Sequence, residues 1–209
     1  MRPWIALLLT AGSLAAAVRH VMGHRHPILI PLLLVPALVL GWMEWQWRQD
    51  QATFSAVATE IAGRPVSIEC QRFGGALLDV TAELGYVQFD ASGRPSDTGR
   101  LERTACSHLR DYLHGDKSSP SLDQVIAVQV LAHESYHLAG SRIESEAECR
   151  AMQRLEDVAG WLGASPSQGR SLADRYSADV YPRMPSAYRT ADCVDGGPLD
   201  LAPDDPTWP

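Results

Sequence analysis

The sequence predicts a helix-dominated α+β fold, with a small antiparallel β element and one or two membrane-spanning segments at the N-terminus. Two observations support this prediction. Apolar patterns follow the order helix, short strands, then several helices, and two apolar runs lie before Glu44. At 209 residues and 22.8 kDa, the chain has room for one domain with a real core plus appendages.

The two N-terminal apolar runs cover residues 4–18 and 28–43. At about 1.5 Å per residue each spans roughly 22–24 Å, which is shorter than the ~30 Å hydrocarbon core of a bilayer. Trp42, Trp45 and Trp47 could form an interfacial belt at the end of the second run. We therefore expect residues 28–43 to be a single membrane anchor within an N-terminal segment of residues 1–47.

The role of the first run stays open between three interpretations. It could form a hairpin with the second run, it could be a signal peptide cleaved near residues 15–17, or translation could start at Met22. In each case the positive-inside rule places Arg25 in the cytoplasm. Residues 48–209 are then expected to form an extracytoplasmic domain on the cell membrane.

The charge of this domain argues against nucleic-acid binding. From Glu44 onward the chain holds 15 Lys and Arg residues against 25 Asp and Glu residues. A protein that binds nucleic acid needs a basic face. We therefore expect no nucleic-acid partner.

The β element is predicted between two helical stretches. A helix over 45–62 ends at the Gly63–Pro65 stop signal. Residues 91–99 are polar and contain Gly, Pro and Ser, so a loop is expected there. Three short strands are predicted before this loop, at residues 66–70, 77–81 and 85–89.

The remaining chain is predicted to be helical except for its end. A helix that starts after Ser119, as N-cap, and Pro120, at the first helical position, carries the motif described below. Residues 163–169 are expected to be a loop, and the tail at 184–209, rich in Pro, Gly and Asp, to be irregular. The other helices are predicted at residues 100–114, 144–162 and 170–181.

Residues 133–137 read His-Glu-Ser-Tyr-His, an HExxH pentapeptide that follows an apolar helical run. His133 and His137 are four residues apart, so on a helix both can direct a ring nitrogen at one metal ion. Glu134 can reach a water on that ion without binding it. This is the arrangement that zinc-dependent hydrolysis requires.

With these residues the sequence resembles the zincin superfamily of metallopeptidases. The resemblance covers about 20 residues and implies that His133 and His137 bind zinc (Zn2+) and that Glu134 is the catalytic base. Position 143, where the metzincin pattern has a third His, holds Ile143. A His₂Glu site resembles the gluzincin group, although Glu144 follows His137 much more closely than in thermolysin-like enzymes.

The third ligand is expected from the acidic stretch after Gly140. Glu144 and Glu148 share one helix face, and Glu146 points elsewhere. We expect Glu144 to be the ligand and Glu148 either to replace it or to orient a histidine. An oxyanion donor is also expected, and the sequence does not select among its candidates. They are Tyr176, Tyr181, Tyr188, His108 and His114.

The four cysteines all follow the expected anchor. An even number in an extracytoplasmic segment favours two disulfides, for which three pairings exist. We prefer Cys70–Cys106 and Cys149–Cys193. Cys149 as a zinc ligand is the alternative.

The function that these patterns favour is hydrolysis of peptide bonds by a membrane-anchored, extracytoplasmic zinc metallopeptidase. Its partners would be a peptide or protein substrate and, through the anchor, the membrane. The alternative is a catalytically silent zincin-like domain that binds metal or takes part in interactions at the cell envelope.

Overall fold

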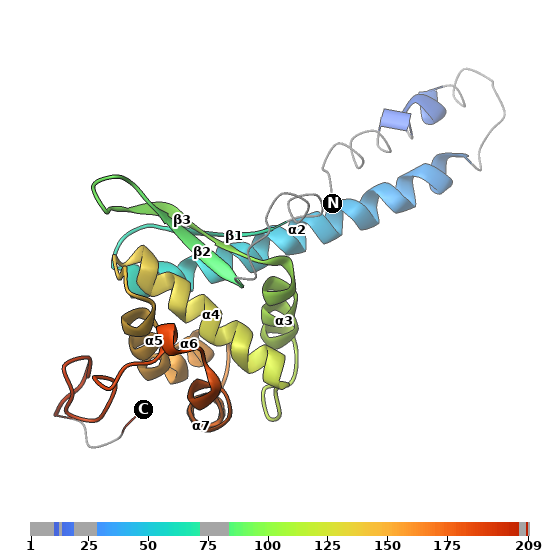
Figure 1. Cartoon of the computed structure of the whole chain (residues 1–209). Coiled ribbons are helices and arrows are strands. Elements are labelled where there is room, and N and C mark those ends of the chain that lie inside the picture. The colour runs from blue at the N-terminus through green and yellow to red at the C-terminus, as the bar shows by residue number, and fades with distance from the viewer. Residues whose placement is uncertain (1–10, 13, 19–28, 72–83, 205–207, 209) are drawn as a thin grey trace. The chain divides into compact units, whose positions relative to one another are not determined.

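The computed structural model describes residues 11–12, 14–18, 29–71, 84–204 and 208 (Figure 1). The chain divides into two compact units, residues 1–50 and residues 51–209. Helix α2 (Leu29–Ala62) crosses this boundary. Strand β1 and all later elements belong to the second unit.

The prediction that the fold begins with a membrane-spanning segment is wrong. Among the residues that the structure describes, no helix is long and apolar enough to cross a membrane. Helix α2 is 34 residues long, but its apolar run ends at Met43, and Glu44, Arg48 and Asp50 follow it. Most of residues 4–18 lie outside the described residues.

The second unit contains a three-stranded sheet with the order β1-β3-β2. β1 (Ser67–Cys70) pairs parallel with β3 (Pro95–Leu101), and β2 (Gly85–Phe89) pairs antiparallel with β3. The sheet is therefore mixed, and the prediction of an antiparallel element is wrong. β1 and β2 were predicted from their alternation, whereas the predicted strand at 77–81 lies outside the described residues.

Strand β3 occupies most of the region that was predicted to be a loop. Its sequence, PSDTGRL, is polar and has low β propensity. A tight turn with Gly93 at φ 80° returns the chain from β2, and β3 then forms backbone hydrogen bonds with a strand on each side. Pairing as the central strand outweighs the propensity of its residues.

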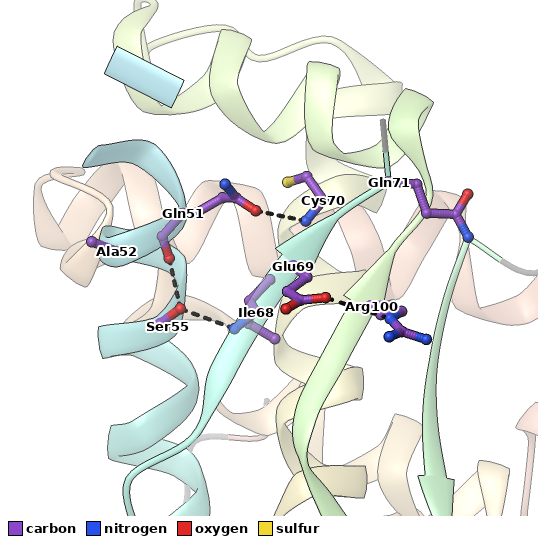
Figure 2. Close-up of a pocket in the computed structure, with 8 residues that line it drawn as sticks. All are labelled: Gln51, Ala52, Ser55, Ile68, Glu69, Cys70, Gln71 and Arg100. Carbon is purple, nitrogen blue, oxygen red and sulfur yellow. Dashed lines mark hydrogen bonds and ion pairs between the residues drawn. The ribbon is translucent and has the colours of Figure 1, made fainter. Parts of the chain in front are cut away.

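The outer edge of β1 is covered by one face of α2. The backbone N–H of Ile68 donates to Ser55 Oγ at 2.9 Å, and that of Cys70 donates to Gln51 Oε1 at 2.9 Å (Figure 2). The N–H of Val66 donates in the same way to Thr59 Oγ1 at 3.2 Å. The three acceptors are four residues apart on the helix, and the three donors are two residues apart on the strand. The two spacings match, at about 6.0 Å on a helix and about 6.6 Å on a strand.

Helix α4 (Leu122–Leu138) is the central element of the second unit and contacts the sheet as well as helices on its other sides (Figure 1). It begins at Leu122, two residues later than predicted, because the N-cap is Ser121 instead of Ser119 and forms a capping box with Gln124. The other helices are α3 (Arg103–His114), α5 (Glu144–Gln153), α6 (Leu155–Trp161) and α7 (Pro166–Asp179), with the 3-10 helices η1 (Tyr181–Arg183) and η2 (Ser186–Tyr188).

Other predicted helix boundaries also differ. Helix α3 begins at Arg103 instead of residue 100, because β3 continues to Leu101. The helix expected at 144–162 is broken at Arg154, whose φ and ψ of −99° and 3° are not helical, so α5 and α6 are separate. Helix α7 begins at Pro166 instead of residue 170, because Ser165 forms a capping box with Gln168 and proline occupies the first helical position.

The core of the second unit forms around the buried apolar face of α4. Val128 and Leu131 on this helix are fully buried, as are Leu109 on α3 and Leu155 on α6. Two disulfides join outer segments to this core. Cys70–Cys106 links β1 to α3, and Cys149–Cys193 links α5 to the C-terminal segment. The preferred cysteine pairing is therefore confirmed.

Candidate metal centre

The last two turns of α4 carry both predicted histidine ligands on a buried face. His133 and His137 are 6% and 5% exposed, and their rings are 4.6 Å apart between centroids. Their Nε2 atoms lie 2.9 Å from each other. The spacing of four residues thus places both rings at one point, as the sequence predicted.

The chain then turns sharply to bring α5 against α4. Gly140, at φ 107°, adopts a left-handed conformation that favours glycine, and its N–H donates to the His137 carbonyl at 2.9 Å. Arg64 Nη2 donates to the Leu138 carbonyl at 3.0 Å and satisfies the end of α4. Because this turn is short, Glu144 at the start of α5 faces the two histidines.

Glu144 completes a group of three donors. Its Oε2 lies 3.0 Å from His133 Nε2 and 3.3 Å from His137 Nε2. Ligands held about 2.0–2.1 Å from zinc in a tetrahedron lie about 3.4 Å from one another. The triangle with sides of 2.9, 3.0 and 3.3 Å is close to one face of such a tetrahedron. The structure therefore contains a possible metal-binding triad of His133, His137 and Glu144.

The second ring nitrogen of each histidine has its own partner. His133 Nδ1 lies 2.8 Å from Glu148 Oε2, and His137 Nδ1 lies 2.7 Å from the Ser141 carbonyl. Both contacts favour a proton on Nδ1, which leaves the lone pair of each Nε2 directed at the shared point. Of the two roles predicted for Glu148, the geometry matches orientation of His133.

Glu148 is itself held by a residue that the sequence did not identify in this role. The carboxylate is 2% exposed, and its Oε1 accepts a hydrogen bond from the hydroxyl of Tyr176 on α7. Tyr176 is 1% exposed. Three buried side chains from α4, α5 and α7 therefore form one chain of hydrogen bonds behind the triad.

The triad concentrates electron pairs in a small volume. Burial lowers the pKa of His133, but the hydrogen bonds with Glu144 and Glu148 outweigh burial and raise this pKa to about 10. Burial also opposes protonation of His137, and the Glu144 contact raises its pKa. The two histidines in turn hold the pKa of Glu144 well below its usual range. A positive charge is stabilised at this point, whether it is a proton or a metal ion.

Glu134, the predicted base, lies next to the triad on α4 and is 4% exposed. Its carboxylate packs directly over Gly85 at the start of β2. A Cβ atom on Gly85 would come within 2.8 Å of Glu134 Cγ and Oε1. Because glycine has no side chain, the Glu134 carboxylate can pack against β2 at this position.

An open cleft of about 510 Å³ exposes the triad to solvent. Strand β2 lines it along one side, and the segment with Met184, Pro185 and Tyr188 lines it along another. The side chain of Glu144 is 44% exposed, so the triad is open toward this cleft. A metal ion held there would keep a position for water or substrate.

Two of the five predicted oxyanion donors line this cleft, Tyr176 and Tyr188. The Tyr188 ring lies 5.7 Å from the His133 ring between centroids. His108, His114 and Tyr181 do not line it. Glu146 pairs with Arg150 at 3.6 Å, away from the triad, and Cys149 is bound in a disulfide, which removes it as a metal ligand.

Comparisons with known proteins identified no similar protein. No protein-family model matches this chain, and neither does any curated protein or solved structure. The site must therefore be interpreted from its own geometry.

Proposed function

We propose that this protein is a zinc-dependent hydrolase of peptide bonds. The observation that carries the proposal is the convergence of the His133, His137 and Glu144 donors beside the carboxylate of Glu134. This arrangement supports the resemblance to zincins with a His₂Glu site.

Zinc fits the donors better than other common ions do. Two imidazoles and one carboxylate suit zinc, whereas magnesium and calcium prefer oxygen ligands in larger numbers. The triangle of donors also supports tetrahedral coordination with one open position. Hydrogen bonds that both Nδ1–H groups donate, to Glu148 and to the Ser141 carbonyl, fix the tautomers that zinc requires.

The residues around the triad have separate roles in this proposal. His133, His137 and Glu144 would hold the zinc ion, which would supply a Lewis acid and lower the pKa of a bound water toward ~7. The Glu134 carboxylate would accept a proton from the water whose oxygen bonds to the peptide carbonyl carbon, and would give it to the amine nitrogen as the C–N bond breaks. Glu148, held by Tyr176, keeps the His133 ring in its orientation. Tyr188 is the candidate that lies best to donate a hydrogen bond to the developing oxyanion.

Strand β2 supports a peptide as the substrate. Among the described residues, β3 is the only strand that pairs with β2, and the cleft runs along β2. An extended peptide can add to such an edge through backbone hydrogen bonds, which places a peptide bond near Glu134. The two disulfides support a working site in an oxidising compartment outside the cytoplasm.

Metal analysis and one substitution test the proposal. The full-length chain is expected to bind one zinc ion and to cleave a peptide library, with products read by mass spectrometry. Glu134→Gln should keep the zinc and lose about 10²–10⁴-fold of the turnover, because the carboxylate moves a proton without binding the ion. Glu146→Gln is the matched control, since Glu146 pairs with Arg150 away from the cleft.

Each alternative gives a different result. A chain that takes up zinc but shows no turnover in either form would be a catalytically silent metal-binding domain. A chain that purifies without metal and does not take up zinc would contradict the metal site itself. Equal turnover in the wild-type and Glu134→Gln proteins would contradict the role of Glu134.

A further inference from the structure

Arg142 lies on the short turn between α4 and α5 and lines the cleft. Among the described residues that line it, Arg142 is the only Arg or Lys. Its guanidinium packs over Gly93, in the turn between β2 and β3, where a Cβ atom would come within 2.8 Å of Nη1. In the part of the chain that the structure describes, no carboxylate pairs with Arg142.

This isolation distinguishes Arg142 from the neighbouring arginines. Arg150 bonds to Ser141 and Glu146, and Arg64 bonds to Asp97 and to two backbone carbonyls. These arginines join parts of the fold. Arg142 is exposed at the cleft with its hydrogen-bonding capacity available for a ligand.

The residues that line the cleft change in chemical character along α4. Strand β2 runs beside this helix in the same sense, since Gly85 packs on Glu134 and the Phe89 ring lies 6.2 Å from the His137 ring. Beyond Phe89, the turn with Gly93 meets Arg142. The triad lies between this cationic end and the opposite end of the cleft.

The opposite end of the cleft is apolar. Ile126 and Val130 lie on α4, seven and three residues before His133, which is about 10 Å and 5 Å along the helix axis. Val180, after α7, and Leu84, before β2, line the cleft as well. A ligand that lies along β2 therefore meets an apolar surface before the triad and a guanidinium after it.

We propose that Arg142 determines specificity by binding a carboxylate of the substrate. The preferred peptide carries an acidic side chain on one side of the scissile bond and an apolar side chain on the other. This inference rests on the proposed peptide hydrolysis, because it places the bond to be cleaved at the triad. A guanidinium suits this role since its planar fork can form two parallel hydrogen bonds with a carboxylate.

The test measures binding, so that it does not depend on turnover. Full-length Glu134→Gln protein is loaded with zinc and titrated with two pools of fluorescently labelled hexapeptides. Each peptide carries apolar residues and one fixed position, which is Glu in the first pool and Gln in the second. Fluorescence anisotropy should give about tenfold tighter binding of the Glu pool at low salt, as expected for one charge-assisted hydrogen-bonded pair.

A second substitution connects this preference to one residue. Adding Arg142→Gln to the same protein should abolish the difference between the pools, and Arg142→Glu should reverse it toward a third pool with Lys at the fixed position. Arg170→Gln is the control, because it removes the same charge on α7, where Arg170 pairs with Glu156. It should leave the tenfold preference unchanged.

The outcomes separate this inference from the proposed function. Equal binding of the Glu and Gln pools, a preference that survives Arg142→Gln, or no binding of either pool would overturn the role of Arg142. Absence of cleavage by the protein with Glu134 intact would instead overturn the proposed hydrolysis. A preference that depends on Arg142 supports the inference even in that case.

Discussion

The two edges of the sheet are finished in different ways. At β1, side chains of α2 accept hydrogen bonds from the outward N–H groups of Val66, Ile68 and Cys70 (Figure 2). At β2, the described residues provide no second strand, and the cleft of the metal centre follows the strand instead. An unpaired strand edge attracts other chains, and proteins usually cover it. Within the described residues, helix side chains close one edge of the sheet, and the edge beside the triad has no such cover.

The largest effect is expected from removing the Cys70–Cys106 disulfide, at the edge of the sheet that α2 covers. Replacing Cys70 and Cys106 by Ala opens a link between residues 36 positions apart, which should lower the free energy of unfolding by about 4 kcal/mol. Urea denaturation measures this loss. Replacing Cys149 and Cys193, which are 44 positions apart, should cost a similar amount and also change the wall of the cleft.

A loss below about 1 kcal/mol for the first pair would mean that the hydrogen bonds of α2 hold β1 without the disulfide. The stability of the covered edge would then come from the hydrogen bonds to α2 alone.

The next largest effect is expected at the open edge. Gly85→Ala places a Cβ atom 2.8 Å from Glu134 Cγ and Oε1, so the carboxylate must move. Misplacing a reacting group by about 1 Å can cost about 100-fold in turnover. Peptide cleavage and zinc content measured together should show lost turnover with retained metal. Gly160→Ala on α6 is the control, because its Cβ atom would meet nothing within 4 Å.

Unchanged turnover of Gly85→Ala would show that Glu134 can work from a displaced position. The close approach of β2 to α4 would then have no role in the chemistry.

The smallest effect is expected from a single bond at the covered edge. Ser55→Ala removes the acceptor for the Ile68 N–H and should lower the free energy of unfolding by about 1–2 kcal/mol, with turnover unchanged. Ser177→Ala is a close control. Both hydroxyls donate to the carbonyl four residues earlier, but only Ser55 also accepts from a strand.

Equal stability of the Ser55→Ala and Ser177→Ala proteins would contradict the view that α2 side chains close this edge. In that result the hydrogen bonds to β1 would contribute no net stability.

The triad could be predicted because local spacing determines most of it. Two histidines four residues apart share a helix face, and Gly140 marks the turn that brings Glu144 back. The sequence left the role of Glu148 open between metal ligand and orientation of a histidine, since spacing alone does not tell which ring nitrogen a carboxylate faces. Tyr176 was considered only as an oxyanion donor, because its contact with Glu148 joins residues 28 positions apart.

The parts of the fold that sequence analysis missed depend on contacts between distant segments. Strand β3 has few apolar residues and is extended because two strands pair with it. The apolar run before Glu44 predicted a membrane span that the described helices do not contain. The closeness of Gly85 to Glu134 follows from the packing of β2 on α4, for which the sequence carries no local signal.

The Cys149–Cys193 disulfide joins the helix with Glu144 and Glu148 to the segment that forms a wall of the cleft. The chain between these cysteines includes exposed residues around Gly163 and Ser165. A single backbone cut there produces two fragments that remain linked. Under oxidising conditions both ends of the cut chain stay attached to the ligand helix, so nicking by other proteases need not dismantle the centre.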